Sequence, residues 1–161
     1  MCYTYSVIKS IPKGEEALIF SVKKFDELNT FELYEILKAR AEVFVAEQKI
    51  TCADPDGADP DCIHCMMWED GKLAAYMRAF VYAENTAKIG RVLTRTRGKG
   101  HGAELMRLSV PEIKKILDCE KIVVSAQTQA LGFYEKTGFI AISEEYLEEG
   151  VPHVKMELKE K

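Results

Sequence analysis

Residues 87 to 127 contain a strand, a loop, a helix and a second strand, and this order limits the folds that the chain can adopt. The strands "AKIGRVLT" (87–94) and "KIVVSAQ" (121–127) are apolar, and a helical run from about 102 to 118 lies between them. Pro111 lies inside that run, where it removes one backbone hydrogen bond and should kink the helix. A helical crossover is the usual connection between parallel strands, so we expect a βαβ unit here.

The first half of the chain predicts hairpins and one long helix. Asp70-Gly71 is a strong two-residue turn signal between two apolar runs. Asn29, followed three residues later by Glu32, resembles a capping box that opens a helix over 29–48. The strands expected in this half are 3–9, which Pro12 and Gly14 should end, and 17–22, 63–69 and 72–81.

The C-terminal part predicts a short helix over 130–138 and two strands within 139–158, around Glu149-Gly150. Hairpins followed by a crossover indicate a central mixed sheet with helices, which is an α/β or α+β sandwich. The chain has 161 residues, of which 47% are hydrophobic, and this fits one domain spanning residues 1–161.

The composition argues against several classes of protein. A net charge of -4 gives no support for a nucleic-acid binder that uses its whole surface, although a local basic patch stays open. The N-terminus lacks the pattern of a signal peptide, and no apolar run approaches the roughly 18 residues of a membrane span. Five cysteines without a secretion signal indicate reduced thiols and a cytoplasmic protein.

The stretch "RTRGKGHG" (95–102) joins the strand at 87–94 to the following helix. The first turn of a helix has unpaired N–H groups and the positive end of the helix dipole, which together bind phosphate oxygens. Glycines let the backbone approach such an anion closely. The basic residues Arg91, Arg95, Arg97 and Lys99 have no acidic residue among them. The stretch is therefore either a phosphate cradle or a solvated basic turn.

Two common phosphate motifs do not fit this stretch. A Walker A loop needs four residues between its glycines and then Gly-Lys-Ser/Thr, which the chain does not supply. A dinucleotide fingerprint runs G-x-G-x-x-G, whereas Gly98, Gly100 and Gly102 run G-x-G-x-G. Both nucleotide motifs are excluded.

Arg-x-x-Gly-x-Gly (97–102), directly after a strand, resembles the acetyl-CoA signature of the GNAT superfamily of N-acetyltransferases. "QTQALGFYEKTGF" (127–139) is similar to the later GNAT motif Asn-x-x-Ala-x-x-Phe-Tyr-x-x-x-Gly-Phe, except that Gln127 replaces Asn. Further segments resemble the ElaA-like branch of that superfamily. They are "RAEVFVAEQ" (40–48), "DPDGADPDCIH" (54–64), "SAQ" (125–127) and "GVPHVKM" (150–156).

The resemblance implies the GNAT fold, a central mixed and mostly antiparallel sheet flanked by helices and splayed at the acetyl-CoA site. The strand ending at Val92 would separate from its neighbour, and its free amides would pair with the pantetheine and help to polarise the thioester carbonyl. The loop amides and the helix N-terminus would bind the CoA pyrophosphate. The cofactor-binding residues implied are Arg91, Val92, Arg97, Gly98, Lys99, Gly100, His101, Gly102 and Gln127.

The resemblance also makes Tyr134 the candidate general acid for the CoA thiolate, because a phenol with a pKa of about 10 matches a thiolate of similar basicity. The alternative is an aromatic residue that only packs. The general base stays open between Glu47, His153 and His64, each inside a segment that matches the branch, and a base acting through water.

A metal site is not expected. Cys62-x-x-Cys65 has no second pair of the same kind, and a strand places its two thiols on opposite faces. "DPDGADPD" (54–61) lacks the glycine at position 6 and the closing glutamate at position 12 of an EF-hand calcium loop. We interpret this aspartate-rich loop as a rim on the substrate side or as a turn with aspartate caps.

The sequence therefore predicts an acetyl-CoA-dependent N-acetyltransferase in which a primary amine of a small molecule or peptide attacks the thioester directly. One alternative is a GNAT-fold module that binds CoA or another acyl-CoA and regulates without turnover. Another is a nucleic-acid binder that uses the basic residues at 91–99. We expect no nucleic-acid or membrane partner, while the acceptor and a homodimer stay open.

Overall fold

The computed structural model describes residues 6–13, 16–49 and 53–159. The strands are β1 Val7–Lys13, β2 Glu16–Lys24, β3 Ile63–Glu69, β4 Lys72–Ala83, β5 Thr86–Thr94, β6 Lys121–Gln127, β7 Phe139–Ala141, β8 Tyr146–Glu148 and β9 Val151–Leu158. The α-helices are α1 Thr30–Arg40, α2 His101–Ile116 and α3 Leu131–Lys136. Shorter helices are η1 Phe25–Glu27, η2 Ala41–Glu47, η3 Asp59–Asp61 and η4 Thr128–Ala130.

All described strands belong to one sheet, in the order β1-β2-β3-β4-β5-β6-β9-β7, with β8 paired to β9. The pair β5 and β6 is parallel, and the other pairs of this sheet are antiparallel. Helix α2 is the crossover between the two parallel strands. The predicted mixed and mostly antiparallel sheet, with a βαβ unit in its second half, is therefore confirmed.

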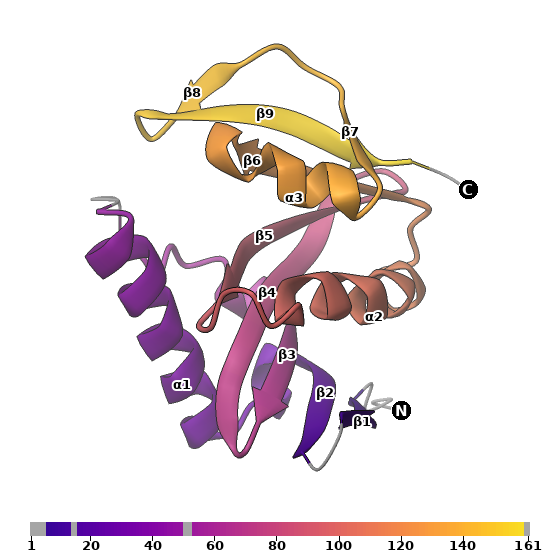
Figure 1. Ribbon diagram of the computed structural model, residues 1–161. Coiled ribbons are helices and arrows are strands. Elements are labelled where there is room, and N and C mark those ends of the chain that lie inside the picture. The colour runs from indigo at the N-terminus through magenta and orange to yellow at the C-terminus, as the bar shows by residue number, and fades with distance from the viewer. Residues whose placement is uncertain (1–5, 14–15, 50–52, 160–161) are drawn as a thin grey trace.

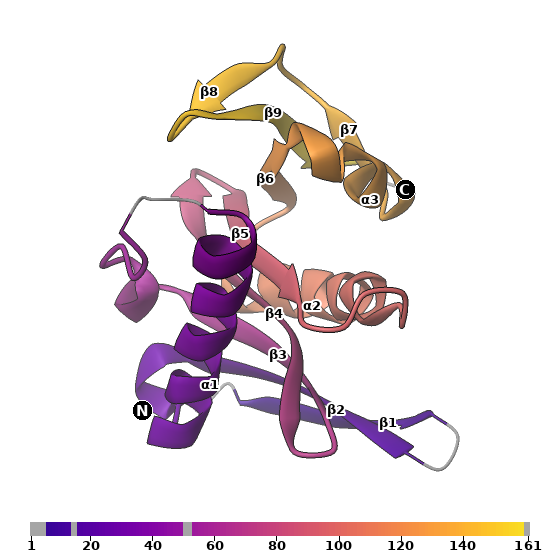
Figure 2. The ribbon, with the colours of Figure 1, turned by 60° about the vertical axis from the view of Figure 1, so that its left-hand side comes forward.

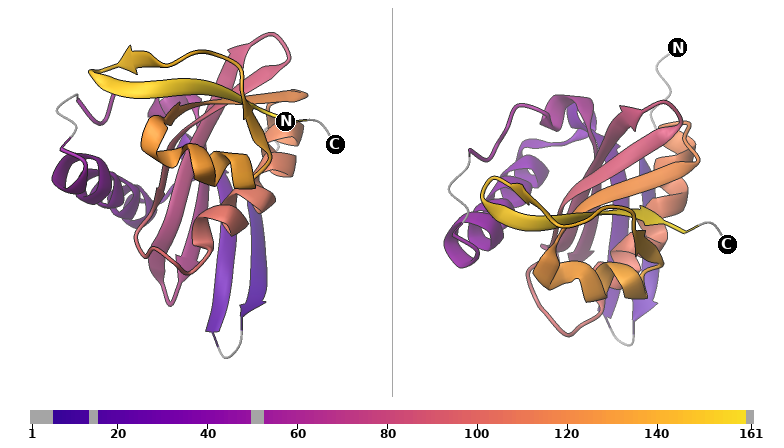
Figure 3. Two further views of the ribbon diagram at one scale, coloured as in Figure 1. Left: turned by 45° about the horizontal axis from the view of Figure 1, so that its top comes forward. Right: turned by 90° about the horizontal axis from the view of Figure 1, so that it is seen from above.

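Helices cover both faces of the sheet. Figures 1 and 3 show α1 on one side and α2 and α3 on the other. The alternation of side chains along β3 divides the core accordingly, since Cys65 and Met67 pack with the α2 side, and Met66 and Trp68 pack with the α1 side. The sheet thus has one apolar core on each face.

Helix α1 begins where the capping box predicts. The Asn29 side chain accepts a hydrogen bond from the Glu32 amide at 2.8 Å, and the Glu32 carboxylate accepts one from the Asn29 amide at 3.0 Å. The single helix predicted over 29–48 is wrong in its second part, because the α-helix ends at Arg40 and residues 41–47 form a π-helix. The π-helix leads directly to the pocket described below, where such segments are common.

Three other boundaries differ from the predictions. The first strand, β1, continues through Pro12, which was expected to end it. Because β1 is an edge strand, the amide donor that proline lacks is tolerated there. Gly14 and residues 3–5 of that prediction lie outside the described part. Helix α2 begins at His101 and continues through Pro111. Residues 139–158 form three strands, because β7 and β8 each pair with part of β9.

Figure 2 shows the β1–β2 hairpin at one end of the sheet and the β7–β9 part at the other. Across the described residues, no helix is long and apolar enough to cross a membrane.

Candidate functional site

Strands β5 and β6 separate halfway along β5. Their pairing covers Thr86 to Ile89 and stops there. On the β4 side, the pairs Tyr76–Leu93 and Arg78–Gly90 enclose one residue of β4 but two of β5, so β5 has a bulge at Arg91 and Val92. Arg91 has a φ of 54°, in the left-handed region that residues other than glycine seldom adopt. The sheet is therefore split, as the resemblance implied, and the split lies beside a strained bulge that the sequence did not predict.

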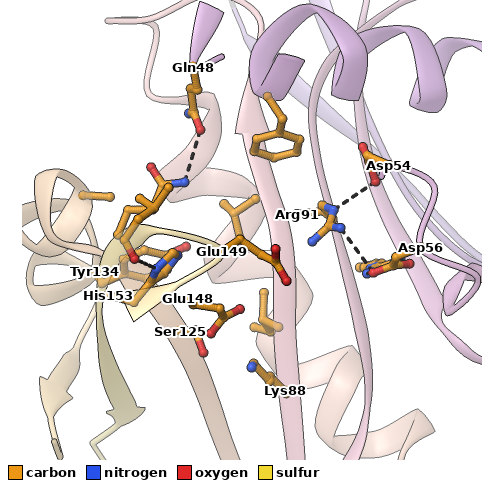
Figure 4. A pocket seen from close by; sticks show the side chains of 18 of the residues that line it. Gln48, Asp54, Asp56, Lys88, Arg91, Ser125, Tyr134, Glu148, Glu149 and His153 are labelled. Atoms are coloured by element: carbon orange, nitrogen blue, oxygen red, sulfur yellow. Dashed lines mark hydrogen bonds and ion pairs between the residues drawn. The ribbon is translucent and has the colours of Figure 1, made fainter. Parts of the chain in front are cut away.

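A pocket of about 320 Å³ opens at this separation. Its walls come from the end of the π-helix, the aspartate-rich loop, β4, β5, the end of β6, α3 and the β8–β9 turn (Figure 4). Five of the predicted site residues line it, namely Arg91, Val92, Gln127, Tyr134 and His153. The chain thus brings residues from positions 91 to 153 around one cavity. The Gln127 side chain also donates a hydrogen bond to Gln48 at 3.2 Å across the opening.

Tyr134 lies in α3 with its ring packed edge-on against two phenylalanines, at 5.1 Å from Phe133 and 5.6 Å from Phe139 between ring centroids. The residue is 7% exposed, and burial raises the pKa of its phenol. The hydroxyl group therefore keeps its proton at neutral pH. The packing interpretation of Tyr134 is correct for its ring, while its position in the pocket wall leaves the acid role open.

His153 lies in β9 opposite Gln127. Its Nδ1 is 2.8 Å from the carbonyl oxygen of Val151, and because a carbonyl only accepts, Nδ1 carries the proton in the neutral ring. The other nitrogen, Nε2, is then a proton acceptor. The ring also stacks on Tyr146 at 6.2 Å. This tautomer is compatible with the predicted base role of His153, which stays a prediction.

The other two base candidates lie elsewhere. Glu47, at the end of the π-helix, forms an ion pair with Arg97 at 3.1 Å on the outside of the protein and is not part of the pocket wall. His64 is 1% exposed and hydrogen-bonds to the Tyr76 hydroxyl at 2.8 Å and to the Asp59 carbonyl at 3.0 Å. Burial lowers the pKa of His64. His64 is therefore a neutral structural residue.

The buried position of His64 predicts a loss of stability in mild acid. An unfolded histidine takes up a proton below about pH 6.5, whereas the folded state resists this protonation. The contribution of His64 to stability is therefore complete above that pH and is lost as the pH falls below it. We expect thermal melts of the wild type to lose stability between about pH 6.5 and 5, and those of His64→Gln to change less. Equal slopes for the two proteins would contradict this assignment.

The glycine-rich loop leads into α2 without a side-chain cap. Gly98 and Gly100 have φ angles of 81° and 77°. Gly100 is the N-cap residue of α2, and no side chain there accepts a hydrogen bond from the helix amides. A Cβ atom placed on Gly100 would meet nothing within 4 Å. The first amides of α2 therefore have no side-chain partner at the cap, and such amides can donate hydrogen bonds to a ligand oxygen.

The resemblance implied that Gly102 and His101 bind the cofactor, but the Cβ position of Gly102 and the ring of His101 lie inside the protein. A Cβ atom on Gly102 would lie 3.1 Å from Thr94 Cγ2 and 3.2 Å from Phe133 Cε2, so this glycine permits close packing inside the protein. The His101 side chain is 1% exposed, with Nε2 3.2 Å from the Glu69 carboxylate. A ligand at the loop would thus meet the backbone of His101, while its ring points inward.

The four basic residues at 91–99 all pair with acidic side chains. Arg91 pairs with the aspartate-rich loop, as described next. Arg95 pairs with Glu35 and Glu42, Arg97 with Glu47, and Lys99 with Glu69. These contacts neutralise the local basic bias that the sequence shows.

The aspartate-rich loop forms a cluster of ion pairs that sequence reasoning missed. We call this the arginine–aspartate cluster; it contains Arg40, Asp54, Asp56, Asp59, Arg78 and Arg91. Burial opposes the ionisation of Asp54 and Asp59, but hydrogen bonds from the arginines outweigh it and hold the pKa of both carboxyl groups below the usual range. The loop is thus a charged anchor as well as a wall of the pocket.

The cysteines in the described part are buried thiols. Burial raises the pKa of Cys62 to about 11 and that of Cys65 to about 12, so both are protonated at neutral pH. Cys52 lies outside the described residues. Within 6–13, 16–49 and 53–159, no group of three histidine, cysteine or acidic residues is arranged to hold a metal ion.

Comparison with known proteins gives consistent matches over most of the chain. A family model described as "Acetyltransferase (GNAT) domain" matches residues 28–160. A UPF0039 protein from Schizosaccharomyces pombe is 38% identical over 146 residues, which cover 88% of this chain and 97% of the relative. Protein ElaA from Escherichia coli is 33% identical over 136 residues, which cover 81% of this chain and 89% of the relative.

Solved structures match as well. The structure of Escherichia coli ElaA aligns with a TM-score of 0.78 and 30% identity over 87% of this chain and 99% of its own. An acyl-CoA N-acyltransferase from Pseudomonas aeruginosa aligns with a TM-score of 0.80 and 36% identity over 88% of this chain and 99% of its own. These proteins share the fold of this chain.

Proposed function

The chain belongs to the GNAT acetyltransferase family, and on that premise we propose that it is an acetyl-CoA-dependent N-acetyltransferase with one domain over residues 1–161. The resemblance to this family and to the ElaA-like branch is confirmed by the matches. In the proposed reaction, a primary amine of a small molecule or peptide receives the acetyl group directly.

The observation that carries the proposal is an uncapped helix N-terminus on the same strand–helix connection as the split in the sheet. We propose that the amides of residues 98–102 bind the pyrophosphate of CoA, and that the pantetheine lies between the separated parts of β5 and β6. Acetyl-CoA supplies the thioester as a cosubstrate. The residues present can accommodate acetyl-CoA, because no atom fills the space at the Cβ position of Gly100 and the pocket lies beyond the last residue pair that joins β5 to β6.

The pocket supplies groups for both proton transfers. His153, through Nε2, would take a proton from the attacking amine, whose nitrogen bonds to the thioester carbon. The carbon–sulfur bond then breaks, and Tyr134 would give its proton to the departing thiolate. The amides beside the bulge at Arg91 and Val92 would stabilise the charge on the carbonyl oxygen. Glu47 does not line the pocket, so the proposed reaction uses His153 as the base.

Release of free CoA thiol from acetyl-CoA, measured with a panel of primary amines, tests this proposal. We expect amine-dependent release, with the acetylated amine identified by mass spectrometry. CoA binding without turnover over a broad panel would instead support the alternative of a regulatory acyl-CoA-binding module.

The same purified protein can be used to test the alternative that the basic residues at 91–99 bind nucleic acid. The ion pairs of Arg95, Arg97 and Lys99 offset the positive charge on which binding along a nucleic-acid backbone depends, whereas the proposed pyrophosphate contact uses backbone amides. We expect no measurable affinity for DNA or RNA at low salt, and strongly salt-dependent binding would contradict this expectation.

A further inference from the structure

The arginine–aspartate cluster lies where the bulge of β5 meets the pocket, and its role is not explained by binding of acetyl-CoA. We propose that this cluster is a positioning device: by holding Arg91 in its left-handed conformation, it fixes the bulge and keeps the sheet split for acetyl transfer. The inference deepens the proposed function and rests on it, and the experiment below separates the two.

The conformation of the bulge requires stabilising contacts from other parts of the protein, because its backbone is strained. Arg91 has a φ of 54°, and a side chain at such an angle costs free energy unless the surroundings compensate. Regular pairing of β5 with β4 would remove the extra residue and shift the following side chains to the opposite face of the sheet. Val92 and the amides beside it would then leave the pocket.

Two carboxylates provide these stabilising contacts as ion pairs with Arg91. Arg91 Nε lies 3.1 Å from Asp54, and Arg91 Nη2 lies 3.2 Å from Asp56. These contacts start at the strained residue itself and end on the aspartate-rich loop, which lies beside the bulge and also lines the pocket (Figure 4). The bulge and the loop are therefore fixed relative to each other.

The loop is anchored in turn by two buried arginines. Arg40, at the end of α1, and Arg78, in β4, are 1% and 4% exposed. Asp59 lies 2.7 Å from both of them, Arg40 also pairs with Asp54, and Arg78 also pairs with Asp56 at 2.5 Å. Helix α1, β4 and the bulge of β5 thus converge on one loop.

The charge balance favours positioning over recognition of the amine. Three guanidinium groups face three carboxylates, and each of these carboxylates pairs with two arginines. The carboxylate of Asp56 is one-third exposed, yet it is held by Arg78 and Arg91. An incoming ammonium group would have to displace an existing partner, so the cluster serves better as a scaffold.

Four variants of the full chain test the proposal. Arg91→Ala removes the ion pairs and keeps a side chain at the strained angle, whereas Arg91→Gly removes the same pairs and relieves the strain. Asp56→Asn weakens the hold from the loop side. Asp61→Asn is the matched control, because its carboxylate lies on the same loop and pairs with no arginine among the described residues.

We expect Arg91→Ala and Asp56→Asn to lower kcat by about tenfold, Arg91→Gly to recover most of that loss, and Asp61→Asn to match the wild type. Affinity for 3′-phospho-ADP, the nucleotide half of CoA, should stay within about twofold, since the glycine-rich loop is unchanged. A wild-type kcat in Asp56→Asn, or an Arg91→Gly variant no better than Arg91→Ala, would overturn the proposal.

Hydrogen–deuterium exchange of residues 86–94 gives a second result that needs no turnover. Exchange should be faster in Arg91→Ala and Asp56→Asn than in the wild type and in Asp61→Asn, because the bulge loses its hold. Unchanged exchange in both variants would overturn the proposal. If exchange changes as expected but the wild type transfers no acetyl group, the proposed function fails while the role of the cluster in fixing the bulge stands.

Discussion

Replacing Gly102 by alanine should weaken the binding of CoA by about tenfold or more, as expected when a tightly packed site receives an extra methyl group. The new Cβ atom would lie 3.1 Å from Thr94 Cγ2 and 3.2 Å from Phe133 Cε2. Relief of these contacts requires the two side chains or the first turn of α2 to shift by a few tenths of an ångström. We expect the first turn to take part of this shift and to carry with it the amides proposed to bind the pyrophosphate.

Calorimetric titration with CoA measures this effect. Thr94→Ser in the Gly102→Ala background removes the methyl group that the new Cβ atom meets, so it should restore part of the affinity. Gly132→Ala is the matched control, because a Cβ atom there meets nothing within 4 Å. An unchanged affinity in Gly102→Ala would contradict the role of the first turn of α2.

Replacing Tyr134 by phenylalanine should lower kcat by about a hundredfold with a much smaller change in KM, since loss of a general acid acts on the transition state. The phenylalanine keeps the ring contacts with Phe133 and Phe139, so packing is preserved. Burial raises the pKa of the phenol, so the hydroxyl group is protonated at neutral pH but is a weaker acid than the free phenol on which the sequence-based prediction rests.

Steady-state kinetics with a turned-over amine check this prediction. Tyr34→Phe is the control, because Tyr34 is 63% exposed and does not line the pocket. An effect of Tyr134→Phe confined to KM would show that the hydroxyl group helps binding without donating the proton.

The features that the sequence predicts well depend on neighbours in the chain. The turn at Asp70 and Gly71 has φ angles of 51° and 72°, which the Asp-Gly pair adopts readily. Asn29 and Glu32 satisfy each other within one helical turn. The glycine-rich loop likewise joins the strand and the helix that flank it in sequence.

The π-helix at 41–47 and the arginine–aspartate cluster depend on distant residues. The helical spacing of residues 29–48 fits an α-helix, and nothing in that spacing marks the wider turn at 41–47. The cluster joins positions 40, 54, 56, 59, 78 and 91, which no local pattern connects. One signal was present: Arg40 lies four residues after Ile36 and three before Val43, on the buried side of the helix. A buried arginine requires acidic partners, and the aspartate-rich loop supplies them.

The choice among the candidates for the general base also depends on residues that are distant in the sequence. Glu47, His64 and His153 all lie in segments that resemble the ElaA-like branch, and their sequence context does not separate them. Burial excludes His64, the ion pair with Arg97 places Glu47 outside the pocket, and the pairing of β9 with β6 brings His153 into it. Tertiary structure alone makes this distinction.

A crystal structure of the protein with CoA tests the central claim most directly. We predict the pyrophosphate within hydrogen-bond distance of the amides of residues 98–102, and the thiol in the opening between β5 and β6, beside Val92 and Tyr134. CoA bound at another surface, with the glycine-rich loop and the split in the sheet empty, would contradict the account.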